Sequence, residues 1–469
     1  MGLGLHGGGL SSAKFLLERG AEITVTDLRD ENTLKPSINE LDTFAKTPVR
    51  YVLGRHEIED FKNADIVIKN PGVRPDSPFL QVSKNAETDI SLFLSESPAR
   101  LFAVTGTKGK SGTASALHWI LNKERKKGRA FLGGNITVSP LTFLDGLTKD
   151  DDVVLELSSF QLGDLKNKLA KDGSPLLKPA AAILTTIMAD HLDRYTSMEE
   201  YVNDKRVIYQ GQDANCITVA EDDPWGNSFL TETKGQPIIR SRKQGLHSPL
   251  QNGGWITKDG TGLTRLSDGK VIELVPQSLL TPGYHQKLNL LSAALAAYAL
   301  GTEAQTIRKA LIVYPGIEHR LEFFHEAGGV RFYNDSAATI PEAAAACIEA
   351  LLQTQGDPQG DPLGGLILVT GGTDKNLDFS PLVSAAKNVK KIILLAGTGS
   401  EKLKQLLNDK NIAYCGPFDN LDNAVHCALE NAFKGDKIAL SPGCASFGMF
   451  LNEFDRGKKW KEAVLRLSS

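Results

Sequence analysis

The chain has 469 residues, of which 41% are hydrophobic and 23% charged, so it is too long for a single core and typical of a globular protein with about three domains. A formal net charge of −3 excludes the basic excess that neutralises a nucleic-acid backbone, and no apolar run approaches the ~18 residues of a membrane span. Five cysteines without a CxxC pair indicate neither a disulfide framework nor a zinc knuckle, and no secretion leader opens the sequence, so we expect a protein of the reducing cytoplasm.

The first expected element is a glycine-rich turn at residues 2–7, which satisfies the GxGxxG pattern and precedes a helical stretch through Arg19. The strand at 23–27 ends in Asp27, where a dinucleotide-binding fold keeps its ribose-binding acid. Taken alone, this pattern predicts NAD binding. The strand that should precede the glycines is absent, however, and its loss would expose the edges of its neighbours. We therefore expect a natural start roughly ten residues upstream.

A second buried strand is expected at 65–68, before a Pro-Gly turn. Further on, the apolar residues 101–104 run directly into Thr-Gly-Thr-Lys-Gly-Lys-Ser at 105–111, which indicates a strand that feeds a phosphate-binding loop. The general GxxxxGK[ST] pattern would require glycine at Val104, so the alternative is a surface turn rich in glycine and lysine. The strand before it and the helical pattern after it favour the phosphate loop.

The residue types of this loop suit a nucleotide and its metal. Glycines let the backbone fold around an anion, the lysine before the helix adds a positive charge, and the serine is placed to offer its hydroxyl to magnesium. The expected contact residues are Gly106, Thr107, Lys108, Gly109, Lys110, Ser111, Gly112 and Thr113.

Two further polar groups follow buried strands. Glu156 interrupts an apolar strand that begins at 152, and a carboxylate at the carboxyl end of such a strand is where a magnesium ligand is expected. The alternative is a strand-end glutamate that faces water. After the strand at 181–186, the segment 190–195 (Asp-His-Leu-Asp-Arg-Tyr) concentrates ionisable groups, which indicates a site, although a solvated loop would also explain it.

The segment between this cluster and the next α/β region has a different pattern. A helix is expected at 198–209, and on the residues alone its Lys205 would be an exposed lysine. Residues 215–276 show short β segments with Asp-Gly turns, which predict hairpins at the edge of a domain, and a helix is expected at 290–300.

The last part of the chain again alternates strands with helices, with strands expected at 330–333, 366–370, 391–396 and 437–441. Each strand ends in a loop of small or polar residues, and ligand sites in open α/β sheets lie beyond the carboxyl ends of strands. The fold class is therefore α/β with three domains: residues 1–97, Rossmann-like with the first strand missing; 98–316, a P-loop ATPase-like parallel sheet with a small β edge; and 317–469, Rossmann-like.

Several stretches together resemble the Mur ligases, the ATP-dependent amide-bond formers of peptidoglycan precursor synthesis, and within them the members that add glutamate to UDP-N-acetylmuramoyl-L-alanine. The resemblance covers essentially the whole chain, and the order of its motifs is highly specific. The stretches are TGTKGKS at 105–111, ELSSFQL at 156–162, DHLDRY at 190–195, HRLE at 319–322, NDSAAT at 334–339, GGTDK at 371–375 and SPGCASFGMFLNEFDRG at 441–457.

The resemblance implies roles for individual residues. Lys110 would contact the β- and γ-phosphates of ATP. Ser111 and Glu156 would bind one magnesium ion, and His191 would bind a second. Lys205 would be carbamylated, which turns a cation into a carboxylate-like metal ligand. The ATP adenine, phosphates and ribose would lie near Asn289, Arg320 and Asp335. Asp27 and Gly72 would bind the UDP substrate, and Asn135 and Ser159 would lie near its carboxylate. The amino acid would be bound by Thr339, Lys375 and Ser446.

The resemblance also implies an ATP-dependent ligase of the EC 6.3.2 class that acts through an acyl phosphate. Its expected small-molecule partners are ATP, magnesium, glutamate (D-glutamate expected) and UDP-N-acetylmuramoyl-L-alanine. It is expected to be a cytoplasmic monomer that neither binds nucleic acid nor inserts into a membrane. Ala337 stands where the family often has lysine. Three alternatives stay open: a ligase like folylpolyglutamate synthase, which lacks a separate UDP domain; an NAD-dependent oxidoreductase; and a non-catalytic Mur-like binding protein.

Overall fold

The computed structural model describes residues 1–5, 7–123, 125–136, 138–246, 248, 251–352 and 364–468. They form two compact units, Met1–Val275 with Leu288–Arg308, and Pro276–Lys287 with Lys309–Ser469. Both units are α/β, as predicted. The first unit contains residues from both of the first two expected domains, so the boundary at 97 stays a prediction. Among the described residues, no helix combines the length and apolarity that a bilayer-spanning segment requires.

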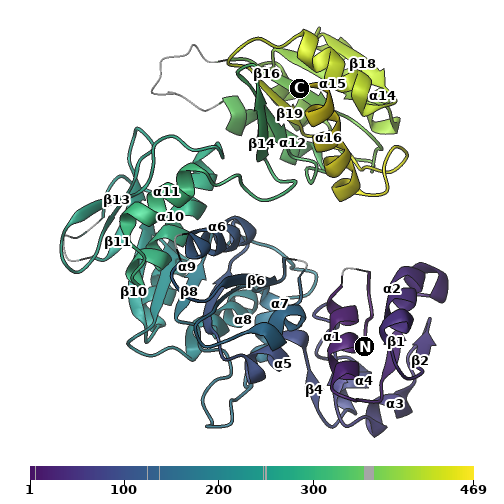
Figure 1. The fold of residues 1–469 in the computed structure, drawn as a ribbon, viewed down its shortest axis with the longest axis vertical. Helices are drawn as coiled ribbons and strands as arrows, with labels where there is room; N and C mark the ends of the chain where they lie inside the picture. The colour runs from purple at the N-terminus through teal and green to yellow at the C-terminus, as the bar shows by residue number, and fades with distance from the viewer. Residues whose placement is uncertain are drawn as a thin grey trace. The chain divides into compact units, whose positions relative to one another are not determined.

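The first 96 residues carry two small parallel sheets, β1-β2 and β3-β4, in place of one continuous sheet. The strands expected at 23–27 and 65–68 are confirmed as β1 and β3 (Figure 1). The elements are α1 (Gly8–Glu18), β1 (Thr24–Asp27), α2 (Glu31–Phe44), β2 (Arg50–Leu53), α3 (Ile58–Asn63), β3 (Val67–Ile68), α4 (Pro78–Gln81), β4 (Ala86–Glu87) and α5 (Asp89–Glu96).

A nine-stranded sheet follows in the same unit, with the order β13-β12-β11-β10-β9-β8-β5-β7-β6. Its central strands are apolar and buried on both faces, as parallel strands between helices are. The strands are β5 (Arg100–Thr105), β6 (Ala130–Gly134), β7 (Asp152–Glu156), β8 (Ala181–Leu184), β9 (Ile217–Glu221), β10 (Gln236–Ser241), β11 (Gly253–Ile256), β12 (Gly262–Arg265) and β13 (Val271–Val275). The helices are α6 (Lys110–Asn122), η1 (Pro140–Gly146), α7 (Ser159–Leu165), α8 (Met198–Gln210), α9 (Pro224–Glu232), α10 (Tyr284–Ala299) and α11 (Ala304–Ile312), of which α10 begins in the second unit.

The prediction of edge hairpins between 215 and 276 is wrong for the first part of that segment. Strands β9, β10 and β11 run parallel and extend the main sheet. Helix α9 makes the crossover from β9 to β10, which a reading based on Asp-Gly turns alone overlooks. Only β11-β12 and β12-β13 are antiparallel, and their turns contain the expected Asp-Gly pairs.

The second unit has a six-stranded sheet with the order β14-β15-β19-β16-β17-β18, in which only β14 is antiparallel. All four strands expected from the sequence are confirmed, whereas β14 and β18 were not expected. The elements are β14 (Glu322–Ala327), β15 (Val330–Asn334), α12 (Pro341–Leu352), β16 (Leu366–Thr370), α13 (Ser380–Ala386), β17 (Lys391–Leu395), α14 (Thr398–Asp409), β18 (Tyr414–Phe418), α15 (Leu421–Glu430), β19 (Lys437–Leu440) and α16 (Glu453–Leu467).

Both faces of this sheet are covered. Alternate residues of β16 enter different cores: Leu368 packs with residues of α12, α13 and α14, whereas Val369 packs with residues of α15 and α16. Figure 1 shows α15 and α16 beside each other. A sheet with helices on both faces leaves its carboxyl edge open for ligands.

Candidate active site

The phosphate loop has the predicted strand-loop-helix form. Strand β5 leads into residues 106–109, and Gly106 and Gly109 adopt φ angles of 142° and 95°, which L side chains rarely tolerate. A Cβ atom on Gly109 would lie 2.5 Å from the amide oxygen of Asn289, so this expected ATP residue lies beside the loop. The N–H groups of Thr107 and Lys108 donate to the Thr186 carbonyl at 2.8 and 3.3 Å, which anchors the outer turn on the segment after β8.

Two lysines meet at the base of this loop. Lys110 Nζ and Lys205 Nζ each donate to the Gly106 carbonyl at 3.0 Å, from α6 and α8. Lys205 is only 1% exposed, so the interpretation of it as a surface lysine is wrong. Helix α8 turns this position inward, beside the ring of Tyr201, whose hydroxyl hydrogen-bonds to Thr107. Burial, with a smaller effect of the Lys110 charge, lowers the pKa of Lys205 to about 7.

Glu156 lies at the end of β7, the strand adjacent to β5. Its side chain is buried, which contradicts the alternative of a water-facing glutamate. One carboxylate oxygen accepts from Asn135 Nδ2 at 3.2 Å, whereas the other is buried and has no hydrogen-bond partner among the described residues. A buried carboxylate oxygen without a donor is costly unless a cation binds it, so Glu156 fits a magnesium ion. Ser111 lies in the first turn of α6, the helix that follows the loop.

The segment after β8 carries Asp190 and His191. His191 is exposed, has a φ angle of 53°, and its ring lies 4.9 Å from that of Phe160 on α7. Asp190 Oδ2 lies 3.9 Å from Lys108 Nζ, and its charge raises the pKa of Lys205 against the lowering by burial. The structure therefore brings Asp190 into the electrostatic surroundings of the phosphate loop.

The expected UDP residues have internal partners. Both Asp27 carboxylate oxygens accept backbone N–H groups, from Gly4 at 3.1 Å and Arg29 at 2.9 Å, so this acid holds the glycine-rich turn. The Gly72 carbonyl accepts from Arg194 at 3.4 Å. Ser159 is buried at the start of α7. The structure leaves the UDP-binding roles of these residues untested.

In the second unit, Asp335 follows β15. Its carboxylate accepts from the Leu321 N–H at 3.0 Å and from Ser441 Oγ at 2.6 Å. Burial raises its pKa to about 6, and these two hydrogen bonds partly oppose that effect. Asp335 thus joins the segment containing Arg320 to the loop after β19.

The three loops expected to hold the amino acid share one edge of this sheet. The loop after β19 is bonded to the loop after β15 by Gly443 N–H to Ala338 O at 2.9 Å, and to the loop after β16 through Thr373 and Ala445. These contacts bring the loops of the expected residues together: Thr339, Lys375 and Ser446.

Arg456, for which the sequence predicts no role, crosslinks two of these loops. It is 1% exposed and donates to Ser336 Oγ at 3.0 Å, the Ser336 carbonyl at 2.9 Å and the Cys444 carbonyl at 3.1 Å. A fully buried arginine that binds only loop groups fixes their geometry. Its place inside the long stretch at 441–457 could have suggested a role.

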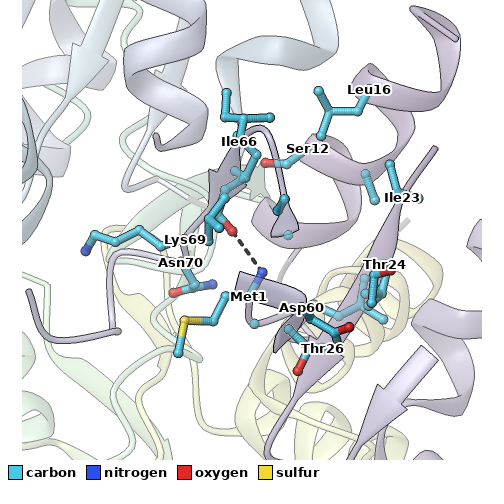
Figure 2. A pocket seen from close by; sticks show the side chains of 18 of the residues that line it. Met1, Ser12, Leu16, Ile23, Thr24, Thr26, Asp60, Ile66, Lys69 and Asn70 are labelled. Carbon is cyan, nitrogen blue, oxygen red and sulfur yellow. Dashed lines mark hydrogen bonds between the residues drawn. The ribbon is translucent and has the colours of Figure 1, made fainter. Parts of the chain in front are cut away.

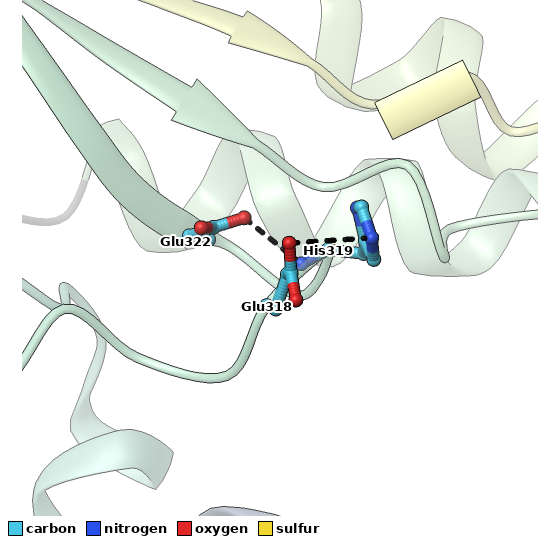
Figure 3. Close-up of side chains that lie close together, drawn as sticks. All are labelled: Glu318, His319 and Glu322. Carbon is cyan, nitrogen blue, oxygen red and sulfur yellow. Dashed lines mark hydrogen bonds and ion pairs between the residues drawn. The ribbon is translucent and has the colours of Figure 1, made fainter. Parts of the chain in front are cut away.

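One group in the second unit has metal-ligand side chains close together: the ligand atoms of Glu318, His319 and Glu322 lie within 4.8 Å of one another (Figure 3). Lys461 donates to both carboxylates, at 2.7 and 3.0 Å. Glu322 also accepts from Asn334 Nδ2 at 2.9 Å. Lys461 and Asn334 thus hold the carboxylates of this group in an ion-pair and hydrogen-bond network.

Family profiles and full-length relatives match nearly the whole chain. Family profiles match residues 1–91 (Mur ligase MurD-like, N-terminal domain), 104–297 (Mur ligase middle domain) and 319–444 (Mur ligase, glutamate ligase domain). The UDP-N-acetylmuramoylalanine--D-glutamate ligase of Treponema pallidum is 39% identical and covers 99% of this chain and 96% of its own. That of a Roseiflexus species is 37% identical and covers 99% and 97%.

A solved structure shares the fold. The UDP-N-acetylmuramate-alanine ligase MurC of Thermotoga maritima superposes with a TM-score of 0.57 at 17% identity, over 99% of this chain and 98% of its own. The matching profiles, the relatives above 30% identity and the phosphate loop with its buried lysine and glutamate agree. The chain belongs to the Mur ligase family.

Proposed function

We propose that this protein is the ATP-dependent ligase that joins D-glutamate to UDP-N-acetylmuramoyl-L-alanine in peptidoglycan precursor synthesis. The full-length relatives at 37–39% identity carry this name, and that likeness is the observation that supports the substrates most directly. The chain also keeps the parts that such a reaction requires: a phosphate loop, a buried carboxylate beside it, and a separate unit with polar loops at its sheet edge.

The reaction begins with the free carboxylate of the UDP substrate. A carboxylate is a poor electrophile, so it attacks the γ-phosphoryl group of ATP and forms an acyl phosphate, with ADP as the leaving group. The glutamate amine then attacks the acyl carbon, and phosphate leaves from a tetrahedral intermediate. Magnesium, when bound, reduces the repulsion between the anions. Lys110 is assigned to the β- and γ-phosphates, and the N–H groups at the start of α6 to their oxygens.

Lys205 is assigned the role of a carbamylated metal ligand. A carbamate forms only on a neutral amine, and a pKa of about 7 supplies that form at neutral pH. Carbamylation converts the buried cation beside Lys110 into an anion, so like-charge repulsion becomes attraction. His191, with Lys205, would serve a second ion, whereas Glu156 and Ser111 serve the first.

The remaining expected residues bind the substrates. Asn289, Arg320 and Asp335 are assigned to ATP, and Thr339, Lys375 and Ser446 to the amino acid. The UDP substrate is assigned to the segment around Asp27 and Gly72, with Asn135 and Ser159 near its carboxylate. The reaction takes place in the cytoplasm, where its nucleotide substrates are made.

The alternatives explain fewer features. Hydride transfer from NAD needs neither the second nucleotide loop nor the buried Glu156. A ligase like folylpolyglutamate synthase would leave the segment matched by the MurD-like N-terminal profile, residues 1–91, without a role.

The test is a product analysis. The protein is incubated with ATP, magnesium, UDP-N-acetylmuramoyl-L-alanine and separate D- and L-amino acids, and the products are weighed by mass spectrometry. We expect condensation with D-glutamate and release of phosphate. Replacement of Lys110 by alanine should lower the rate by at least ~100-fold, since it removes a charge from the transition state, whereas Lys149→Ala, on an exposed loop, should not change it. An unchanged rate in Lys110→Ala, or condensation with another amino acid only, would contradict the proposal.

A further inference from the structure

Arg194 bridges two segments to which the proposed reaction assigns different ligands. Its Nη1 atom donates to the carbonyl oxygens of Pro71 and Gly72, each at 3.4 Å. These carbonyls belong to the substrate turn, residues 70–73 after β3, whose Gly72 is assigned to the UDP substrate. Arg194 itself follows His191, which is assigned to a magnesium ion. The reaction as proposed leaves this arginine without a role.

An aromatic ring supports the Arg194 guanidinium. The central carbon of the guanidinium lies 3.7 Å from the centroid of the Phe160 ring on α7, within the range of a cation–π contact. The His191 ring packs against the same phenyl ring, with centroids 4.9 Å apart. The N–H groups of Arg194 and Tyr195 also donate to the His191 carbonyl, at 2.9 and 3.1 Å. Arg194 and His191 therefore belong to one turn and share one aromatic support.

Tyr195 fixes the main chain beside Arg194. Its side chain is buried, and its hydroxyl donates to the Asp204 carboxylate on α8 at 2.9 Å. Asp204 precedes Lys205, whose amine donates to the Gly106 carbonyl of the phosphate loop. The backbone of the arginine is thus anchored beside the phosphate loop, and its side chain reaches across to the substrate turn.

A buried ion pair holds the base of the substrate turn. Lys69 is 6% exposed, and its Nζ atom lies 2.7 Å from the Asp164 carboxylate on α7. The same amine donates to the Val73 carbonyl at 2.9 Å, which ties the end of the turn to its beginning. Figure 2 shows the Lys69 side chain extending away from Thr24 of β1. The substrate turn is therefore held at its base by Lys69 and at its middle residues by Arg194.

The Arg194 charge also acts on this buried pair. Burial lowers the pKa of Lys69 and raises the pKa of Asp164, and the attraction between the two groups opposes both effects. The positive charge of Arg194 lowers the pKa of each group. A substitution that removes this charge would therefore disturb the pair, whereas lysine at position 194 would keep it.

Arginine suits this position in a way that lysine does not. Its planar guanidinium can stack on a ring through its face and donate hydrogen bonds through its edge at the same time. The placement of the turn matters for the reaction, because a carboxylate must be held about 3–3.5 Å from the phosphoryl group that it attacks. A UDP substrate bound to a displaced turn would hold its carboxylate away from the phosphate loop.

We propose that Arg194 is a positioning residue for the UDP substrate: it holds the carbonyls of Pro71 and Gly72 against the segment that contains His191. This inference rests on the proposed function, because it takes Gly72 as part of the UDP site. Arg194 acts through the substrate turn, so its loss should weaken binding of the UDP substrate and leave binding of ATP unchanged.

The test replaces Arg194 by lysine, which keeps the charge near Asp164 but loses the planar group. Arg129→Lys is the matched control, because Arg129 also lies over a phenyl ring, that of Phe131 at 4.8 Å, and donates to a carbonyl, that of Gly146 at 3.0 Å. It precedes β6, at the end of the sheet opposite to the phosphate loop. Calorimetry gives the Kd of UDP-N-acetylmuramoyl-L-alanine in the presence of magnesium and a non-hydrolysable ATP analogue, and the Kd of the analogue is measured separately.

We expect Arg194→Lys to raise the Kd of the UDP substrate about tenfold and to leave the Kd of the ATP analogue unchanged. Hydrogen exchange at the Val73 amide, which donates to the Asn70 carbonyl within the turn at 2.9 Å, should be faster in the same variant. Arg129→Lys should match the parent in all three measurements.

Equal Kd values for the UDP substrate in the parent and in Arg194→Lys would overturn the inference. An equal loss of affinity for both ligands would also overturn it, because Arg194 would then be a general structural support. If the lysine variant does not fold, Arg194→Gln is measured in the same way, and the same outcomes decide. A parent that binds the ATP analogue but not the UDP substrate would overturn the proposed function and the inference together, and this outcome is recognised in the parent alone.

Discussion

Lys205 is the residue whose environment departs furthest from its sequence context. A solvent-facing lysine is the ordinary interpretation of such a helix position, because the residues around it on α8 are largely polar. Lys205 is buried against the phosphate loop, where the Gly106 carbonyl accepts a hydrogen bond from its amine, and this partner is 99 residues away in the chain. The local pattern therefore could not predict that Lys205 is buried, whereas the resemblance to the family marked it as a site residue.

The first prediction at this scale concerns the pH dependence of stability. Because the folded-state pKa of Lys205 lies below its unfolded value, the native state binds fewer protons between about pH 7 and pH 10.5. The Lys205 contribution to the free energy of unfolding should therefore rise as the pH increases through this window. Replacement by methionine, which cannot ionise, should remove this slope. Urea unfolding at pH 6.5, 8 and 9.5 in bicarbonate-free buffer checks the difference, and parallel profiles for both proteins would contradict it.

The second prediction concerns the side-chain amine of Lys205. Incubation with ¹³C-bicarbonate at pH 8 should produce a carbamate signal in the NMR spectrum that Lys205→Arg lacks, since a guanidinium stays protonated. The exposed Lys149→Arg serves as the matched control and should keep the signal. Loss of ligase activity in Lys205→Arg without any carbamate signal in the parent would assign the lysine a purely electrostatic role.

At the scale of elements, the carboxyl ends of β8, β9 and β10 are tied together beside the phosphate loop. Glu221 at the end of β9 is buried and accepts from Arg240 on β10 at 2.6 Å and from the Thr186 hydroxyl at 2.7 Å, and it is paired with Arg242. The Thr186 carbonyl in turn holds the loop N–H groups of Thr107 and Lys108. The network therefore connects β9 and β10 to the phosphate loop.

Replacement of Glu221 by glutamine should loosen this network. Removing one partner of a buried ion pair typically costs about 3–5 kcal/mol. We expect a lower melting temperature and a KM for ATP that rises more than kcat falls, because the phosphate loop loses its outer anchor. Asp213→Asn, which breaks an exposed pair with Lys178 in the same unit, is the control and should leave both measurements unchanged. An unchanged KM for ATP in Glu221→Gln would contradict this prediction, because the phosphate loop would then not depend on the contact between Glu221 and Thr186.

Strands that are buried on both faces could be located from their apolar runs in the sequence. Strands β5, β7, β8 and β16 were predicted in this way, and so were the polar residues at their carboxyl ends, Glu156 among them. Glu221 ends a strand of the same kind, but the prediction of hairpins placed β9 at an edge, so its carboxylate was not considered. Strand β14 begins with the buried Glu322 inside a polar motif, and its other residues are partly buried or exposed, so no apolar run marks it.

At the scale of the whole molecule, the fold class was predictable because the strands and helices alternate, whereas the division into compact units was not. The segment 276–287 belongs to the second unit although α10 continues into the first. The approach of Asn289 to Gly109 likewise depends on packing between elements far apart in the chain. The site residues were found through a resemblance of spaced motifs, which carries such long-range information, whereas periodicity does not.

The two units have separate hydrophobic cores, so damage to one core should leave the other unit intact. Trp460 on α16 is fully buried in the second unit, and its indole N–H donates to the Tyr333 carbonyl at 3.1 Å. Its replacement by alanine should lower the stability of that unit by about 3–5 kcal/mol. Hydrogen exchange should accelerate in β16 but not in β5. Phe433→Ala, which truncates a side chain that is 70% exposed in the same unit, should change neither strand. Equal acceleration in β5 and β16 would mean that the two units unfold as one cooperative structure.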